Sequence, residues 1–403
     1  MSDKAFTFSH AGEQISQTLK RSKWSQPDRF NLENKKDKTR LQALITSGDT
    51  VDIHDQVQLI AEDLYDLAHP EQKDSKDPNT YADFIANITA QGMEYGEWFF
   101  FPWSRALVRY PEREDLRRIR TSRNRNLITS SEQERLYEAT VAVFGLSVGS
   151  NVVEALLSSG IGGKLIIADM DTIEPSNLNR IRADFTQVGV KKLDYVAKRI
   201  SMIDPYIEQV HLPAGLTAEN LETVVTNHRP DVIIDEVDNL PIKIQLRKVA
   251  QKEGLPIVMA TDDGDNALLD IERYDLESIE PFNGRIPAEI IDSVISGEFP
   301  REKLGLVIGK YFVGVENIPL RMFQSLQEVG KTLPSWPQLG NAAATGGTAA
   351  AFATRQIILD RNLPTQRVMV DFDKLMNSEI HTKEYRRDLA MYRAMLEDIP
   401  VVS

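Results

Sequence analysis

Short apolar runs and helical apolar spacing alternate through the middle of the chain. The apolar run at residues 141–144 is followed at once by Gly145, and apolar side chains then recur at helical spacing. A second apolar run at residues 165–168 ends on Asp169, and Asp171 follows two positions later. This pattern predicts a β-α-β unit of about 30 residues with acids at the end of its second strand.

The alternation continues to about residue 260. Strands are predicted near residues 141–144, 165–169, 208–212, 232–235 and 256–260. Helices are predicted near residues 150–159, 191–202, 218–227 and 241–253. The order of these elements predicts an α/β fold, a Rossmann-like and mostly parallel sheet with helices on both faces.

The flanking regions have patterns of their own. Residues 1–125 are predicted to form a mainly helical N-terminal region that ends in a basic segment, with a strand at 97–103 packed on the main domain. Residues 126–403 are predicted to form the α/β domain. Within it, prolines separate short helices over 276–340, and small residues predict a close-packing helix over 341–358. A strand and a charged helix are expected to end the chain.

Composition narrows the class of protein. The chain has 403 residues and no cysteine, which excludes disulfides, a cysteine nucleophile and a cysteine-based zinc site. The formal net charge of −13 argues against a nucleic-acid partner. The apolar stretches are far shorter than a membrane span, and the first ten residues lack an apolar signal core. We therefore expect a cytoplasmic protein without a membrane partner.

The β-α-β unit has the chemistry of a nucleotide site. Amides at the N-terminus of its helix can point at phosphate, and Asp169 after the second strand can accept ribose hydroxyls. The dinucleotide-binding pattern has glycine where Ser147 and Ser150 stand. A purely structural β-α-β unit is therefore the alternative interpretation.

Two charged clusters have open interpretations. The arginines within residues 105–125 form either a solvated helix face paired with neighbouring acids or a phosphate contact, because guanidinium matches phosphate oxygens. Asp262, Asp263 and Asp265 follow a predicted strand. Solvated loop acids are the favoured interpretation for these three, and a metal or substrate role is the alternative.

Further polar residues follow the unit in a fixed order. Residues 175–180 read PSNLNR, residues 188–192 read VGVKK and residues 231–239 read DVIIDEVDN. With the glycine turn and the acid, this set resembles the ThiF/MoeB/HesA family, whose adenylation domain is shared with ubiquitin-activating enzymes. The resemblance runs from about residue 123 to about residue 275. It looks closest to bacterial members that are sometimes fused to a nitroreductase-like domain.

The resemblance implies a ThiF-like adenylation domain that uses ATP and Mg²⁺. Its parts are a nucleotide-binding core at 140–275, a covering segment at 276–340 and a C-terminal helix and strand at 341–403. The implied nucleotide-binding residues are Gly145, Ser147, Gly149, Asp169, Asp171, Asn177, Arg180 and Lys192. The implied catalytic residues are Arg125, Asn177, Arg180, Lys192 and Asp238, with Asp238 as the Mg²⁺ ligand. In the family the arginine matching Arg125 acts across a homodimer.

Each implied role has a structural alternative. Asn177 can cap a helix, Arg180 can pair with Asp184, and Asp238 can cap the helix that begins near Pro241. Lys191 and Lys192 can both be ordinary helix-surface charges, and the choice between them for the phosphate role is open.

The chain also departs from the family pattern. The glycine turn reads GLSVGS, and the absence of cysteine excludes a thioester step and the family's zinc site. We therefore expect an adenylyltransferase that activates a carboxylate, or an amide oxygen, of a small molecule or peptide. The alternatives are a NAD-binding oxidoreductase and a non-enzymatic nucleotide-binding partner of a nitroreductase-like protein.

Overall fold

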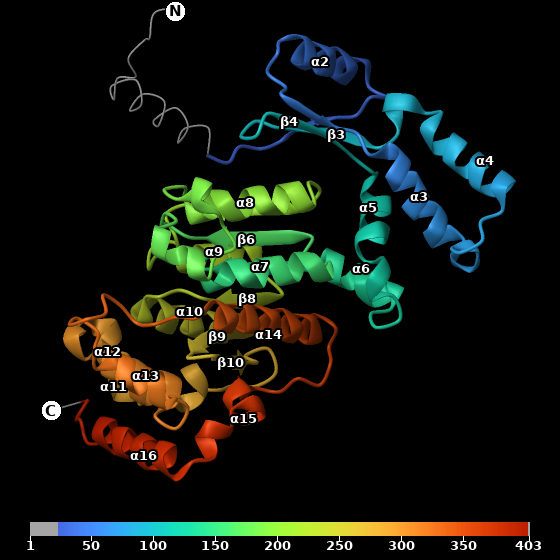
Figure 1. Cartoon of the computed structure of the whole chain (residues 1–403). Helices are drawn as coiled ribbons and strands as arrows, with labels where there is room; N and C mark the ends of the chain where they lie inside the picture. The colour runs from blue at the N-terminus through green and yellow to red at the C-terminus, as the bar shows by residue number, and fades with distance from the viewer. Residues whose placement is uncertain (1–22, 402–403) are drawn as a thin grey trace, which may run out of the picture. The chain divides into compact units, whose positions relative to one another are not determined.

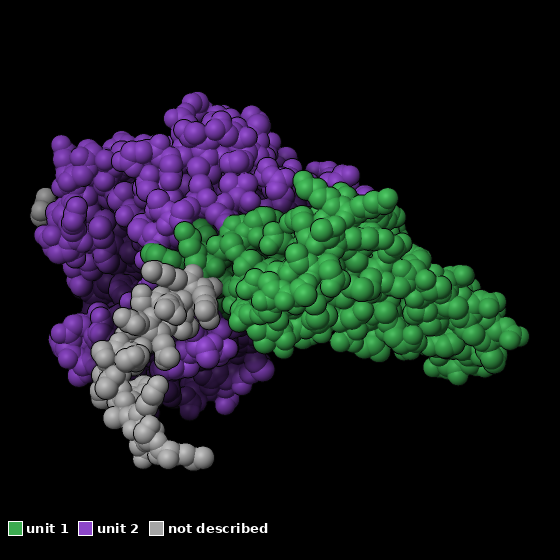
Figure 2. Space-filling model, turned by 90° about the horizontal axis from the view of Figure 1, so that it is seen from above, with its two compact units in different colours: residues 1–133, 158–160, 189–207 green, residues 134–157, 161–188, 208–403 purple. Residues whose placement is uncertain are grey.

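The computed structural model describes residues 23–401, and these form two compact units (Figure 2). The first unit comprises residues up to 133 together with 158–160 and 189–207, and the second comprises 134–157, 161–188 and the remainder of the chain. The boundaries of these units differ from the domain boundary predicted at residue 125. That domain division stays a prediction. Between residues 23 and 401, no helix combines the length and the apolar content needed to cross a bilayer.

The first unit contains a small sheet as well as helices. Its strands lie in the order β1-β3-β4-β2, and they are β1 (Asp28–Phe30), β2 (Asp52–His54), β3 (Glu97–Phe101) and β4 (Ala106–Tyr110). Its longer helices are α2 (Lys35–Thr46), α3 (Val57–Ala68), α4 (Pro78–Thr89), α5 (Arg113–Arg120) and α8 (Lys192–Ile203). Phe30, Trp98 and Phe100 pack in its core. The predicted strand at 97–103 is thus β3, and it belongs to this sheet.

The second unit is built on a seven-stranded sheet in the order β11-β10-β9-β8-β5-β6-β7 (Figure 1). The strands are β5 (Thr140–Phe144), β6 (Lys164–Ala168), β7 (Glu208–Leu212), β8 (Val232–Asp235), β9 (Ile257–Asp263), β10 (Asn266–Glu272) and β11 (Gln366–Val370). Strands β5 to β9 pair in parallel, while β10 and β11 are antiparallel. The five predicted strands and the Rossmann-like α/β class are confirmed.

Helices cover both faces of this sheet, as predicted. On one face, glycines of α14 (Gly340–Ile358) lie against Ala260 of β9 and against α7 (Val148–Ser159). On the other face, α9 (Leu221–His228) and α10 (Leu240–Glu253) pack with the apolar side chains of β5, β6 and β8. The small residues of α14 allow this approach, because a Cβ on Gly347 would lie 2.7 Å from the Asn151 backbone carbon.

A helical layer packs against α10 and β9. It consists of α11 (Ala288–Ser296), α12 (Leu304–Val307), a π-helical segment (Ile308–Gly314), α13 (Leu320–Leu326) and α16 (Lys383–Glu397), while α15 (Phe372–Met376) follows β11. Ile244, Met259, Phe282, Phe312 and Phe323 are buried together there. The predicted short helices between prolines are confirmed. The predicted role of 276–340 as a cover over a nucleotide stays a prediction.

Candidate active site

The turn after β5 requires glycine. Gly145 has φ +88°, and a Cβ at this position would lie 2.1 Å from the Glu236 carbonyl oxygen. Its amide donates a 2.8 Å hydrogen bond to the Ala168 carbonyl. Only a residue without a side chain can take this conformation at this distance. Strands β5, β6 and β8 therefore meet tightly at their carboxyl ends.

Asp169 lies directly after β6 and is 8% exposed. Its Oδ2 accepts a 2.7 Å hydrogen bond from the Leu146 amide, and its Oδ1 accepts a 2.8 Å bond from the Asp171 amide. Each carboxylate oxygen has a second lone pair, so the group can also accept ribose hydroxyls. Asp171 is exposed beside it. Asp169 thus fixes the turn as well as occupying the position predicted for ribose recognition.

Serines stand at the N-terminus of α7. Ser150 Oγ donates a 2.8 Å hydrogen bond to the Ser147 carbonyl, and Arg180 Nε donates a 3.1 Å bond to Ser147 Oγ. A Cβ on Gly149 would lie 3.0 Å from the side chain of Val143, so this position also favours glycine. The first amides of a helix are not bonded within the helix, and they attract anions. An arginine and a helix N-terminus therefore meet at one point.

Asn177 lies in the 3₁₀ helix Pro175–Asn179, and Arg180 is the residue that follows this helix. Asn177 is buried, and its Oδ1 accepts a 3.1 Å hydrogen bond from the Glu174 amide in a capping box. The structural alternative for Asn177 is therefore observed. The alternative for Arg180 is not, because Asp184 caps the next turn through the Thr186 amide, and no ion pair joins these two residues in the described chain.

Asp238 and Asn239 are neighbours in the loop after β8, and they have different roles. Asn239 caps α10, because its Oδ1 accepts a 3.1 Å hydrogen bond from the Ile242 amide. The alternative interpretation of Asp238 as that cap is therefore wrong. Asp238 is exposed. Within residues 23–401 no group of three or more His, Cys, Asp or Glu side chains could hold a metal. A Mg²⁺ ion at Asp238 would need phosphate and water oxygens as further ligands.

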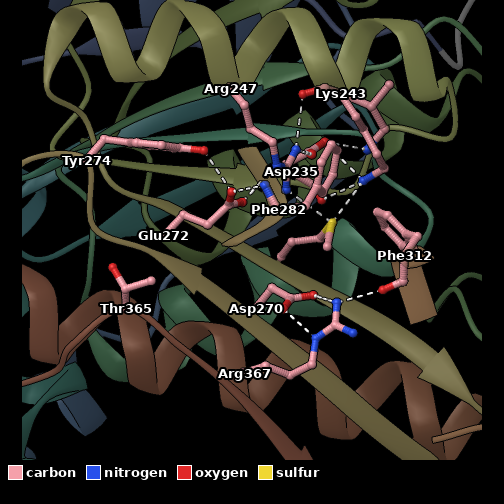
Figure 3. A network of polar contacts seen from close by, with 12 residues as sticks. Asp235, Lys243, Arg247, Asp270, Glu272, Tyr274, Phe282, Phe312, Thr365 and Arg367 are labelled. Carbon is pink, nitrogen blue, oxygen red and sulfur yellow. Dashed lines mark hydrogen bonds and ion pairs between the residues drawn. The ribbon is translucent and has the colours of Figure 1, made fainter. Parts of the chain in front are cut away.

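A buried charge network lies beneath this loop (Figure 3). Arg247 is fully buried, and it donates to Asp235 Oδ2 at 2.6 Å while its Nε lies 2.7 Å from Glu272 Oε2. Lys243 Nζ lies 3.2 Å from both Asp235 Oδ1 and the Asp235 carbonyl. Burial opposes ionisation of Asp235, but Lys243 and Arg247 outweigh it and lower its pKa. Asp235 Oδ1 also accepts from the Val237 amide, so the network anchors the loop that carries Asp238.

Two acids that the sequence places in a loop lie instead at the end of β9. Asp262 and Asp263 belong to the strand, and Asp263 is 2% exposed, so these two are not solvated loop acids. Only Asp265 lies in the exposed turn, where it accepts a 2.8 Å hydrogen bond from Asn341. Burial raises the pKa of Asp262 to about 6, with Arg180 opposing the shift. Burial, Asp371 and Asp373 together raise the pKa of Asp263 to about 7.

The two remaining predicted residues belong to the first unit. Lys192 is the first residue of α8 and is buried, whereas Arg125 follows a 3₁₀ turn and is exposed. Their part in the site stays a prediction. Within α5, Arg117 pairs with Glu114, and Arg118 pairs with Asp115. For these arginines the structure shows the solvated, paired helix face.

The sheet and its glycine turn define a Rossmann-like α/β domain with a polar site at the carboxyl ends of its strands. Residues 121–264 match the ThiF family. The chain therefore carries a domain that is similar to the ThiF family over these residues.

Several proteins are similar to this chain, and each match covers only part of the other protein. An uncharacterized protein of Mycobacterium tuberculosis is 35% identical over 278 residues, which is 69% of this chain and 38% of that protein. The tRNA threonylcarbamoyladenosine dehydratase of Bacillus subtilis is 35% identical over 34% of this chain and 54% of its own length. The sulfur carrier protein adenylyltransferase of Thermus thermophilus is 32% identical over 31% of this chain and 46% of its own.

The chain thus spans between about a third and about a half of the curated relatives it matches. Among solved structures, the E. coli tRNA N6-threonylcarbamoyladenosine dehydratase aligns with a TM-score of 0.43 and 20% identity. That alignment covers 60% of this chain and 95% of the other. A likeness of this size carries no argument about the site.

Proposed function

We propose that the chain is an ATP- and Mg²⁺-dependent adenylyltransferase that activates a carboxylate, or an amide oxygen, of a small molecule or peptide. The observation that carries the proposal is the contact of Arg180 with Ser147 at the N-terminus of α7, beside the Asp169-bound turn. Amides and a guanidinium together suit a phosphate, and the acid suits a ribose. Relatives named as sulfur carrier protein adenylyltransferases support the reaction class.

Each charged residue has a defined task in this proposal. Arg180 and Lys192 neutralise phosphate charge, and Asn177 donates to a phosphate oxygen. Asp238 is the residue that would hold Mg²⁺, a hard ion that prefers carboxylate and phosphate oxygens, and the ion supplies charge neutralisation on the triphosphate. Arg125 would reach the site of a second copy in a homodimer and stabilise departing pyrophosphate.

The absence of cysteine limits how the activated acyl group can leave the site. No side chain of the 403 residues can take an acyl group as a thioester. The acyl-adenylate is therefore either released or attacked in the same site by an acceptor molecule.

Pyrophosphate exchange tests the proposal. Wild-type protein is incubated with ATP, Mg²⁺, labelled pyrophosphate and a library of carboxylates and peptides, and we expect label in ATP with one substrate class only. Arg180→Ala should bind ATP more weakly by about 1.5–3 kcal/mol, roughly ten- to a hundredfold in Kd. Arg182→Ala, two residues away and exposed, is the matched control and should bind like the wild type.

The alternatives give different results. Thermal stabilisation by NAD rather than ATP would point to an oxidoreductase, whereas ATP binding without exchange for any carboxylate would point to a non-enzymatic nucleotide-binding partner. Unchanged ATP affinity in Arg180→Ala would contradict the placement of the triphosphate.

A further inference from the structure

Asp262 lies where β9 reaches the carboxyl edge of the sheet, next to the proposed nucleotide site. Two residues earlier on the strand, the Ala260 amide donates a 2.8 Å hydrogen bond to Oε1 of Glu236, in the loop after β8. Glu236 in turn lies against the glycine turn, since its Cγ is 3.6 Å from the Cβ position of Gly149. The strand end is therefore tied to the loop that contacts the phosphate-binding turn.

The carboxylate of Asp262 is only partly satisfied. Its Oδ1 is covered and has no hydrogen-bond partner in residues 23–401, and this oxygen lies 4.0 Å from the Cβ position of Gly346 on α14. Its Oδ2 has a single contact, 3.5 Å from Nε2 of Gln338, at the limit of a hydrogen bond. The residue is partly exposed, so Oδ2 is the oxygen left to accept a proton.

The charges around Asp262 are of both signs. Arg180 faces it from the phosphate side and favours its ionised form. Glu236, in the loop after β8, is a second carboxyl near it, and burial raises the pKa of Glu236 well above its usual range. No ion pair neutralises Asp262 within the described part of the chain. Asp262 Oδ2, with its one long contact to Gln338, is therefore the oxygen that can bind a proton.

We propose that Asp262 is the general base of a second step, in which an amine acceptor attacks the carbonyl carbon of the bound acyl-adenylate. The inference rests on the proposed function. As the C–N bond forms, the bond from the carbonyl carbon to the AMP phosphate oxygen breaks, and its electron pair leaves with AMP. The proton of the attacking nitrogen passes to Asp262 Oδ2 and then to water.

Three observations favour this role over a purely structural one. The chain has no cysteine, so an acceptor that reacts in this site attacks the adenylate itself and not a thioester. A general base acts best when its pKa lies near the working pH, and burial places that of Asp262 at about 6. An unpaired carboxylate also attracts an ammonium group, which favours an amine over an anionic acceptor.

The test separates the two half-reactions. The acyl donor is a carboxylate that supports pyrophosphate exchange in the wild type, and the nucleophile probes are ethylamine and hydroxylamine. Hydroxylamine captures activated acyl groups without a base. Asp262→Asn should keep exchange within about twofold of wild type and form the ethylamide about a hundredfold more slowly, because general bases contribute this much. Its hydroxamate formation should be unchanged.

The pH profile and a matched variant complete the test. The wild-type rate of ethylamide formation, expressed per unprotonated ethylamine, should fall below about pH 6, and Asp262→Asn should lose this limb. Asp262→Glu should recover part of the rate. Asp263→Asn changes the next acid along the strand, which is buried near Asp371 and Asp373 and not near Arg180, and it should behave as wild type in both half-reactions.

Several results would overturn the inference. Ethylamide formation at the wild-type rate in Asp262→Asn excludes a base role, and a parallel loss of exchange places Asp262 in nucleotide binding. Hydroxamate without ethylamide in the wild type rejects an amine acceptor. Absence of exchange with every carboxylate is a different failure, because it rejects the proposed function itself.

Discussion

Polar residues of the site bind the backbone as well as facing the proposed ligand. Asp169 accepts from two amides, and Asn177 closes a capping box, so changing either residue disturbs a turn. Arg180 is different, because its side chain bonds to Ser147 Oγ, Asn179 Oδ1 and the Ser176 carbonyl, which all lie near the surface. Arg180 is therefore the cleaner probe of nucleotide binding.

The Asp263 carboxyl should make stability depend on pH. The unfolded chain releases this proton near pH 3.8, whereas the folded protein releases it near pH 7, because Asp263 is buried and faces Asp371 and Asp373. The folded state therefore binds more protons between these values, and the contribution of Asp263 to stability falls as the pH rises from about 4 to about 7. Above pH 7 its contribution is constant.

Asp263→Asn removes this titration. The melting temperature of the variant should rise relative to wild type as the pH increases from 5 to 8. Asp265→Asn, in the exposed turn of the same hairpin, is the control and should follow the wild type at each pH. A constant difference between wild type and Asp263→Asn over this range would show that Asp263 ionises normally in the folded protein.

The sequence predicts part of this site and not the rest. Gly145 and Asp169 follow from the β-α-β pattern, because a tight turn and a strand-end acid are local features. For Asp262 and Asp263 the sequence predicts a loop, because acids are uncommon in strands. The dipeptide Gly264–Asp265 is typical of a two-residue hairpin loop. This signal in the sequence would have extended the predicted strand as far as Asp263.

At the scale of elements, the sequence predicts the parallel strands of the large sheet together with β3 and β11, and it misses the other strands. Strands β5, β6, β8 and β9 appear as apolar runs because helices bury both their faces, whereas the edge strand β7 is partly exposed. Strand β10 was not predicted, and β1 and β2 have three residues each, too few for an alternation to stand out. The buried network was also not predicted, because Asp235, Arg247 and Glu272 meet only after α10 packs on the sheet.

The network should be sensitive to the loss of one partner. Arg247→Met leaves Asp235 with Lys243 alone and leaves Glu272 without its cation, and breaking a buried pair in this way costs about 3–5 kcal/mol. Lys248→Met, on the exposed side of the same helix, breaks only a surface pair with Asp292 and should cost less than about 1 kcal/mol. Urea unfolding measures both changes.

A similar midpoint for the two variants would mean that the network contributes nothing to stability. The triple variant that also carries Asp235→Asn and Glu272→Gln should regain part of the loss, because no buried charge of this group is then left without a partner except Lys243.

At the scale of the whole molecule, the ThiF-family domain covers only part of the chain. The first unit adds a four-stranded sheet that precedes the matched residues 121–264, whereas Arg125 falls within the match. The proposed homodimer gives Arg125 a role, since a residue acting on a second copy need not contact its own site. Twofold pairing is also the commonest form of oligomer.

The homodimer is tested by mass and by complementation. Sedimentation should give twice the mass of one 45.5-kDa chain. Arg125→Ala and Asp238→Ala should each be inactive in exchange, and a mixture that has exchanged subunits should regain about a quarter of wild-type activity, because half the dimers are hybrids with one intact site in two. Full activity at the mass of one chain would reject the dimer, and no recovery in the mixture would reject the role of Arg125 in trans.

The buried network also constrains how this sequence can change over time. Asp235, Arg247 and Glu272 come from a strand, a helix and another strand, yet none of the three charges can be replaced alone at low cost. Descendants of one ancestor should therefore either retain all three or have exchanged them as a set. Across related sequences the three positions should covary, whereas Lys248, one residue from Arg247, should vary independently of all of them.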